Sequence, residues 1–202
     1  MIENEITYEF IADRLCLDFC NTGEDRTENY VGELLGSYSG LLNWSVQAGL
    51  LTGSQASRLD ALAAANPAAA NRVYQRAVTL REALYRQFSA LAGSRDLASE
   101  DLKILNDVLA QALGHRQVQR TESGFAWAWQ RPGDDLDQML WPVALSAAEL
   151  LTSPEVSRVH ECGNGNCSWL FLDLSRNHSR RWCKMESCGN RVKARRFRRR
   201  EK

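Results

Sequence analysis

Apolar side chains recur at three- and four-residue steps over most of the chain, which predicts a mainly helical fold. One helix is expected to end at Gly49, because glycine readily adopts the left-handed conformation of a helix cap. Thr52 and Gln55 form a capping-box pattern that opens a second helix. Asn66 and Pro67 supply an N-cap and a first-turn proline for a third, longer helix. These signals predict successive helices joined by short turns.

Two segments alternate with period two and predict β-structure. Residues 116–130 alternate about a Glu-Ser-Gly turn, so they are expected to form a β-hairpin. Residues 14–22 alternate over a shorter range and end in turn-forming residues, so they are expected to form a strand. Two more helices are expected, one capped by Ser99 and one from about residue 134 to residue 151 with a kink at Pro142. Strands are therefore expected to be few.

The overall charge of zero is a cancellation between two parts of the chain. Residues 1–155 carry 12 Lys and Arg against 21 Asp and Glu, a net charge of −9, whereas residues 156–202 carry 13 against 4, a net charge of +9. This asymmetry predicts a boundary near residue 155, with a basic module suited to a polyanion after it. A basic tail that docks on its own acidic domain is the alternative.

Composition and length fit an α+β protein with two domains of unequal size. The 202 residues, 44% hydrophobic and 25% charged, suffice for one ordinary domain with a small module attached. The first ten residues are acidic and lack the features of a secretory signal, so a cytoplasmic location is expected. The apolar segment 140–151 is too short to cross a bilayer, so no membrane partner is expected.

Four of the six cysteines lie within 27 residues, as two Cys-x4-Cys pairs separated by 15 residues. Tetrahedral zinc needs four ligands that converge at about 2.3 Å for sulfur, and two short cysteine pairs joined by a loop can deliver them. We therefore predict one structural zinc ion bound by Cys162, Cys167, Cys183 and Cys188. Four thiolates leave no open coordination position, so this zinc is expected to stabilise the fold without catalysing a reaction.

The alternatives for these cysteines are two disulfides or four unrelated buried thiols, and a reducing compartment disfavours the disulfides. His160 and His178 are alternative metal ligands, but each lies outside the paired spacing. Cys16 and Cys20 are expected to be buried packing residues, as free cysteine commonly is.

A polar cluster stands where the expected strand 14–22 ends. It consists of Asp18, Asn21 and Thr22, and the end of a strand is a common place for a ligand site. These residues are a candidate pocket for an unknown small-molecule effector. An ordinary turn or helix cap explains Asn21 and Thr22 equally well.

Residues around the predicted zinc indicate a small treble-clef-like module. Alternation over residues 168–175 predicts a short hairpin strand, with Trp169 and Phe171 forming a small core. The basic run beyond Cys188 has a helix-forming composition, and its charges surround the expected helix. Phosphates relieve the repulsion among such charges, so nucleic acid is the expected partner, and DNA more than RNA.

RNA stays an alternative because the aromatic side chains of the module can stack on unpaired bases. The residues expected to contact nucleic acid share a basic or amide side chain and lie near the second cysteine pair or beyond it. They are Arg176, Arg180, Arg181, Lys184, Asn190, Arg191, Lys193, Arg195, Arg196 and Arg199.

A family resemblance rests on these same residues. Cys188-Gly-Asn-Arg191, preceded by Arg181-Trp-Cys183 and followed by Lys193-Ala-Arg-Arg196, resembles the CGNR zinc finger over the whole of residues 156–202. Upstream, Leu15-Cys-Leu-Asp-Phe-Cys-Asn-Thr22, Leu80-Arg-Glu-Ala-Leu84 and the tryptophan-rich hairpin resemble the ABATE domain that precedes this finger in bacterial proteins. The resemblance implies a stress-induced transcription regulator in which the finger binds DNA and residues 1–155 sense a ligand.

The leading functional hypothesis is a zinc-dependent DNA-binding transcription regulator. A lone finger reads few base pairs, so a homodimer that binds two half-sites is also expected. The alternative is a zinc-scaffolded module that binds RNA or protein without sequence-specific DNA binding. An enzyme is not expected, because the sequence shows no Ser-His-Asp set, phosphate loop or paired-acid motif. Removal of the metal is expected to unfold residues 156–202 and to leave residues 1–155 folded.

Overall fold

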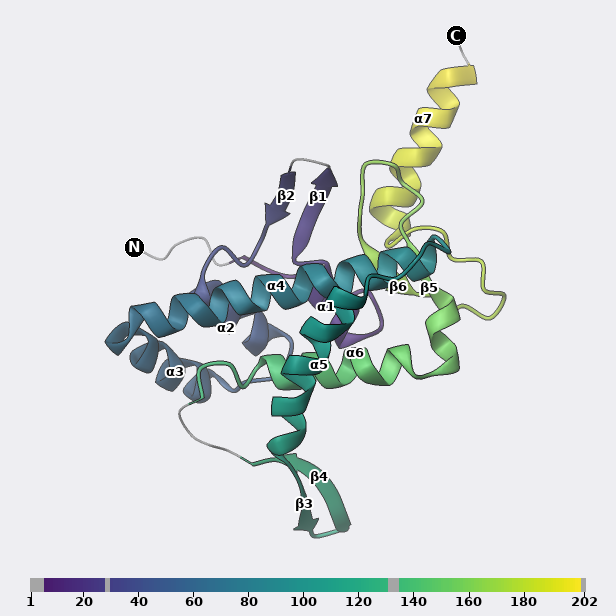
Figure 1. Ribbon diagram of the computed structural model, residues 1–202. Helices are drawn as coiled ribbons and strands as arrows, with labels where there is room; N and C mark the ends of the chain where they lie inside the picture. Colours follow the sequence, from purple (N-terminus) through teal and green to yellow (C-terminus); the bar gives the residue numbers. More distant parts are fainter. Residues whose placement is uncertain (1–5, 28–29, 131–134, 201–202) are drawn as a thin grey trace.

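The computed structural model describes residues 6–27, 30–130 and 135–200, and it has the expected α+β character (Figure 1). A 3₁₀ turn spans Pro154–Arg158 and a π-helical turn spans Met185–Gly189. The α-helices are α1 (Leu15–Cys20), α2 (Tyr38–Gln47), α3 (Gly53–Ala65), α4 (Pro67–Ala92), α5 (Ser99–Gly114), α6 (Leu140–Leu151) and α7 (Asn190–Arg200).

The strands pair as three separate antiparallel hairpins in the described part of the chain. They are β1 (Gly23–Thr27) with β2 (Tyr30–Glu33), β3 (Arg116–Thr121) with β4 (Gly124–Trp129), and β5 (Val159–Glu161) with β6 (Leu170–Leu172). The hairpin predicted over residues 116–130 is confirmed, whereas β1 and β2 were not predicted. None of the described helices is both long and apolar enough to cross a membrane.

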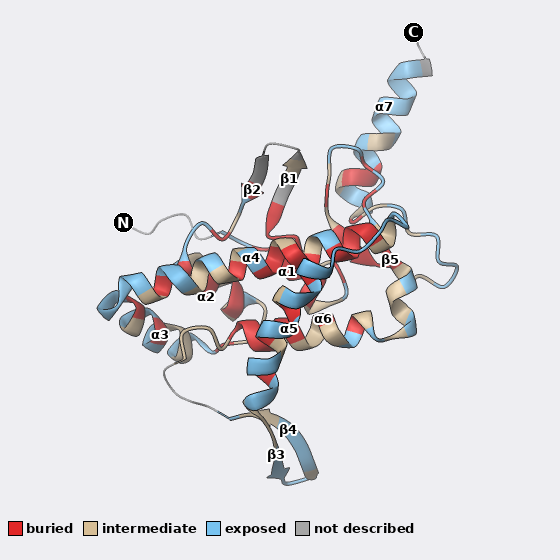
Figure 2. Ribbon diagram, in the orientation of Figure 1, coloured by how far each residue is buried: buried red, intermediate tan, exposed pale blue. Residues whose placement is uncertain are grey.

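The 26-residue helix α4 organises the main core. It packs against α1, α2, α3 and α5, and its inner face buries Ala77, Leu80, Leu84 and Phe88 completely. The buried residues follow this face across the molecule, while the opposite face of the helix is exposed (Figure 2). This division is what the three- and four-residue spacing of its apolar positions predicts.

Helix boundaries follow the predicted capping residues at three places. Gly49 lies just beyond α2 and has φ +72°, the left-handed conformation expected of it. Thr52 and Gln55 form the reciprocal capping box that opens α3. The side chain of Asn66 accepts a hydrogen bond from the backbone N–H of Ala69 at 3.1 Å, so it caps α4.

Two expected helix features are wrong. Ser99 does not cap α5, because it is already the first helical residue and the capping position belongs to Ala98, which makes no side-chain bond. The last long helix begins at Leu140, and residue 134 lies outside the described residues. Pro142 therefore stands in the first turn, where a missing N–H breaks no intrahelical hydrogen bond and no kink follows.

The strand expected over residues 14–22 is also wrong, because residues 15–20 form the helix α1. Cys16, Leu17, Phe19 and Cys20 are fully buried and Asp18 is nearly so, so this short helix is enclosed by the protein on almost all sides. A helix pairs its own backbone groups, which suits a segment with no adjacent strand to pair with. A short apolar run gives no periodicity that separates a buried helix from a buried strand.

Buried charge holds the β1–β2 hairpin against α4. The guanidinium of Arg81, only 1% exposed, donates two hydrogen bonds of 2.8 Å to the carboxylate of Glu33 in β2. Arg26 in β1 pairs with Glu82 at 3.1 Å and lies over the ring of Tyr85 at 3.7 Å. Paired partners offset the desolvation of these arginines, so the hairpin is fixed on the helix.

Strand β6 belongs to two cores at once. Leu170 and Leu172 are buried in the main core, whereas Phe171 between them is buried in the cysteine cluster of the C-terminal module. Side chains alternate between the faces of a strand, so three residues suffice to place side chains in both cores. The side-chain amide of Asn21 donates to the carbonyl of Leu170 at 2.9 Å and accepts from its N–H at 2.8 Å. We call β6 and Asn21 together the joint.

Asp18 gives the fold a testable pH dependence. Burial raises the pKa of Asp18 to about 6, although its Oδ1 accepts hydrogen bonds from the backbone N–H groups of Ala12 and Ile11. Because this pKa lies above the ordinary value of 3.8, the folded state favours the protonated form, and stability is lost as pH rises from about 4 to about 6.

Asp18→Asn keeps an acceptor at Oδ1 and does not titrate. We expect the free energy of unfolding of the wild type to rise by about 1 kcal/mol relative to this variant when the pH falls from about 7 to about 5. Urea titrations of both proteins with zinc present, at several pH values, measure this difference. Parallel curves for the two proteins would show that Asp18 keeps an ordinary pKa.

Candidate metal centre and basic helix

The four predicted cysteines meet at one point. Their Sγ atoms all lie within 4.8 Å of one another. The Sγ of Cys183 lies 3.8 Å from that of Cys167 and 3.6 Å from that of Cys188. Tetrahedral zinc with bonds of about 2.3 Å to sulfur requires sulfur atoms about 3.8 Å apart, so the cluster fits one zinc ion.

Local structure brings each cysteine to the cluster. Cys162 directly follows β5, and Cys167 precedes β6, so the first pair forms the turn of that hairpin. The backbone N–H of Cys167 donates to the carbonyl of Asn164 at 2.7 Å, and this bond closes the turn. Cys183 follows a loop, and Cys188 lies in the π-helical turn that leads directly into α7. This order of knuckle, hairpin, loop and helix is the predicted treble-clef-like arrangement.

Hydrogen bonds within the cluster favour the thiolate of Cys162, whereas the bonds to this thiolate raise the pKa of Cys167 to about 12 and also raise the pKa of Cys183. Thiol hydrogen bonds from Cys167 and Cys183 lower the pKa of Cys162, and the backbone N–H groups of Cys183 and Asn164 lower it further. The side-chain amide of Asn164 donates to the Sγ of Cys188 at 3.3 Å. Asn164 is only 1% exposed, so it is a fixed outer partner of the metal site.

A zinc ion with four cysteine ligands has no open coordination position. Phe171 is fully buried beside the cluster, and Trp169 and Trp182 pack against it, so the zinc completes a core that is too small to be stable alone. When bound, zinc supplies structural cross-linking and no activated water. This geometry supports a structural role.

The remaining cysteines and histidines lie outside the cluster. The metal-ligand grouping found among the described residues consists of the four cysteines alone. His160 packs against the ring of Phe171, with centroids 5.9 Å apart. Cys16 and Cys20 are buried in the main core, where burial raises the pKa of Cys16 to about 12. These two cysteines are packing residues, as expected.

Helix α7 projects away from the rest of the molecule (Figure 1). Its described residues are exposed except for the half-buried Val192, and none of them is acidic. It contacts the π-helical turn that carries Cys188. The zinc site therefore holds the base of a basic helix whose remaining length is free to contact a partner.

The ten residues predicted to contact nucleic acid divide by what their side chains touch. Arg176, Arg181, Lys193, Arg196 and Arg199 are exposed and form no ion pair with another described residue. Arg191 lines a cavity beside the cluster. The other four bond to protein groups, and they are Arg180, Lys184, Asn190 and Arg195.

Arg180 links the C-terminal module to the N-terminal segment through hydrogen bonds. Its five hydrogen bonds reach the carboxylate of Asp13 and the carbonyls of Ile11, Leu172, Trp182 and Cys183. A guanidinium has five N–H donors, so none is left for a phosphate. The prediction that Arg180 binds nucleic acid is therefore replaced by a structural role.

Three other predicted contacts also bond within the protein. Arg195 donates to the side-chain oxygen Oδ1 of Asn164 and so links α7 to the cysteine knuckle. Lys184 pairs with Glu9 at 3.1 Å, and the side chain of Asn190 donates to the carbonyl of Glu186 at 3.0 Å. Lys184 and Asn190 are surface groups that can exchange these bonds for a phosphate contact, because exposed pairs are weak.

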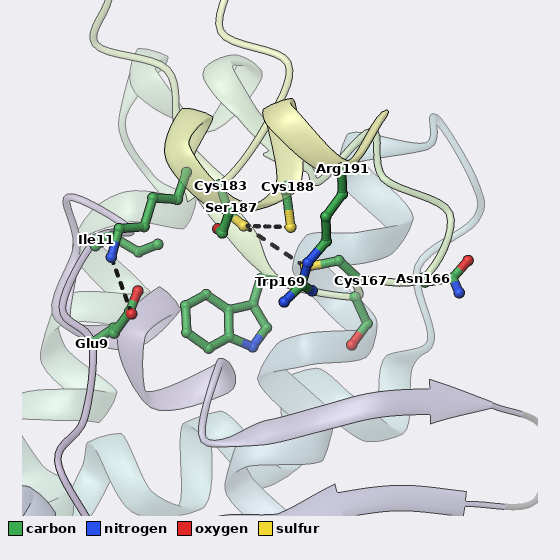
Figure 3. Close-up of a pocket in the computed structure, with 11 residues that line it drawn as sticks. Glu9, Ile11, Asn166, Cys167, Trp169, Cys183, Ser187, Cys188 and Arg191 are labelled. Atoms are coloured by element: carbon green, nitrogen blue, oxygen red, sulfur yellow. Dashed lines mark hydrogen bonds and ion pairs between the residues drawn. The ribbon is translucent and has the colours of Figure 1, made fainter. Parts of the chain in front are cut away.

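A cavity of about 350 Å³ opens beside the cysteine cluster. Its lining includes the cations Arg191 and Lys184 and the indole of Trp169, and Figure 3 shows the side chain of Arg191 reaching toward Trp169 and Cys167. Glu9 also lines this cavity and pairs with Lys184, whereas Arg191 forms no ion pair with a described residue and suits a phosphate group.

The predicted effector pocket corresponds to a cavity of about 220 Å³ lined by Asp18, Asn21 and Thr22. Their side chains are already bonded, Asp18 to two backbone N–H groups, Asn21 to Leu170, and Thr22 to the carbonyl of Phe19 at 2.8 Å. These residues fix the joint and the chain around it. Their role in effector binding stays a prediction.

The fold and the site together define a zinc-finger protein with a helical N-terminal domain. The family model named ABATE, described as "Putative stress-induced transcription regulator", matches residues 13–154, and the CGNR zinc finger model matches residues 158–201. The chain belongs to the ABATE family, and it carries a CGNR zinc finger. No curated protein matches it.

Asn164 gives the first prediction for the metal site. Asn164→Ala removes the N–H···S bond to Cys188 and the partner of Arg195, so we expect zinc affinity to fall about 10- to 100-fold. Competition with a colorimetric zinc chelator measures the affinity. Asn166→Ala, in the same turn but exposed, is the matched control and should retain wild-type affinity.

Zinc removal gives the second prediction. The sequence alone implied that all of residues 156–202 unfold without zinc, but the joint is expected to keep β6 folded. We expect a chelator to increase backbone hydrogen exchange in residues 162–168 and 174–200 and to leave β6 protected, because Leu170 and Leu172 remain in the main core. Hydrogen exchange with mass spectrometry measures this. Equal loss of protection in β6 and α7 would contradict the role of the joint.

Proposed function

We propose that the protein is a DNA-binding transcription regulator in the cytoplasm and that α7 is its DNA-contacting element. The observation that carries this proposal is an exposed helix with basic side chains around its circumference and no acidic residue among those described. Like charges at such spacing destabilise a helix, and phosphates neutralise them. Protein packing gives no reason for this composition, because α7 buries almost none of its surface.

The dimensions of α7 suit the major groove of DNA. Eleven helical residues extend about 16 Å, and a helix with its side chains is about 10–12 Å wide. The major groove of B-DNA is about 12 Å wide and admits an α-helix. Arginine forks bind phosphates and guanine edges in two-point contacts, which supports DNA as the partner.

The zinc in this proposal positions the helix and does no chemistry. Cys188 and Asn164 fix the base of α7 through the thiolate cluster and Arg195. Arg191 and Lys184 then stand at this base, and Arg196 and Arg199 stand farther out along the helix. Binding without catalysis follows from the closed coordination of the site.

A salt titration tests the proposal. Arg196→Gln with Arg199→Gln removes two cations that share one face of α7, so the slope of log affinity against log salt should fall by about 2. Fluorescence anisotropy with duplex DNA, at several salt concentrations, measures this slope. Arg72→Gln with Arg120→Gln removes the same charge from exposed positions on α4 and β3, and it should leave the slope unchanged.

If both double variants showed the same slope of log affinity against log salt, binding would depend on the charge of the whole molecule and not on α7. Absence of binding to duplex DNA at low salt would overturn the proposal. A preference for single-stranded RNA over duplex DNA would favour the RNA-binding alternative. The homodimer expected from half-site geometry stays a prediction.

A further inference from the structure

A third, larger cavity is lined in part by the β3–β4 hairpin. This hairpin lies far from α7 (Figure 1). Its volume is about 870 Å³, which lies within the range of small-molecule sites in proteins. Residues from the turn between α2 and α3, from the hairpin and from the start of α6 line it. Three separate parts of the chain therefore converge on it.

The lining of this cavity combines apolar side chains with uncharged polar ones. Among the described residues that line it, none is Asp, Glu, Lys, Arg or His. The cavity beside the cysteine cluster, by contrast, is lined by Glu9, Lys184 and Arg191. A charged ligand placed here would lose its hydration without gaining an opposite charge, so the cavity selects for neutral molecules.

Two tryptophans form one wall. Trp129 and Trp141 lie with ring centroids 6.0 Å apart and planes tilted by 48°. His115 stacks on Trp141 at 4.0 Å, and Arg116 lies over the ring of Trp129 at 4.5 Å. These contacts lie outside the lining and fix both indoles, so the wall is preorganised for a flat ring.

Four glutamines supply hydrogen-bonding groups, and they are Gln55, Gln119, Gln130 and Gln138. Gln55 uses its carbonyl oxygen in the capping box of α3, which leaves its NH₂ group. The other three side-chain amides form no hydrogen bond to any residue of the described chain. A glutamine amide presents a donor beside an acceptor, which matches the paired edge of a carboxamide or an aminopurine.

We propose that this cavity binds a small, uncharged, planar heterocycle with a carboxamide or amino-imine edge. An indole face contacts one face of the ring, and the glutamine amides bond its edge. This site is separate from the predicted effector residues Asp18, Asn21 and Thr22, and it does not depend on DNA binding by α7.

Matched probes test the chemical class. Nicotinamide and adenine are neutral and planar, nicotinate has the ring of nicotinamide with a carboxylate, and glucose is neutral but not planar. Isothermal titration calorimetry of the full-length, zinc-loaded protein should show nicotinamide or adenine binding in the millimolar range or tighter, with nicotinate at least about tenfold weaker than nicotinamide. Nicotinate or glucose binding as tightly as the neutral heterocycles, or no binding of either heterocycle, would overturn the proposal.

Two variants locate the binding. Gln138→Glu places a carboxylate in the cavity wall and should weaken the heterocycle at least about fivefold, whereas Gln75→Glu adds the same charge on an exposed position of α4 and should not. Ala128→Phe places a phenyl ring in the cavity wall beside Trp129 and should weaken binding. Thermal unfolding followed by circular dichroism verifies that each variant folds. Unchanged binding in folded Gln138→Glu and Ala128→Phe would exclude this cavity.

Discussion

The alternation of side chains along β6 holds the two parts of the chain together. Leu170 and Leu172 lie in the main core, and Phe171 lies beside the zinc ligands, so neither core is complete without this strand. Asn21 fixes the register by bonding both backbone groups of Leu170. Arg180 adds two hydrogen bonds across the same boundary, to the carboxylate of Asp13 and to the carbonyl of Ile11. The orientation of the zinc site, and therefore of α7, depends on this arrangement.

Contacts at the start of α7 explain how such a strongly basic helix can form. Repulsion among its arginines disfavours α7 as an isolated helix. The turn that carries Cys188 orders the backbone where the helix begins, which removes part of the cost of nucleation. Arg195, one of the cations of the helix, donates a hydrogen bond to the side chain of Asn164 in the cysteine knuckle. The position of α7 therefore depends on the zinc site, and the position of the zinc site depends on the joint.

The sequence predicted best those features that are encoded locally. The cysteine spacing identified all four members of the metal cluster, and capping residues placed the starts of α3 and α4. The helix α1 was missed because its run of six residues is buried almost all around and is too short to show a distinguishing period. The hairpin β1–β2 was missed because its stability comes from the distant partners Arg81 and Glu82.

The roles of the basic residues could not be predicted from charge alone. Arg180 looks like its neighbours in the sequence, and only the folded chain brings Asp13 and Ile11 to it from more than 160 positions away. Asp18 and Asn21 were recognised as an unusual polar group, but their partners in the loop before α1 and in β6 are set by tertiary contacts. No local signal distinguishes a polar side chain that binds a ligand from one that bonds a distant backbone.

The sharing of β6 has a consequence for the evolution of this architecture. A zinc finger connected by a flexible linker can be exchanged between proteins, because its folding is independent of its neighbours. Here Val159, Leu170 and Leu172 of the finger are buried in the core of the helical domain. Neither part can be transplanted alone without exposing apolar surface, so the two must be inherited and must change together.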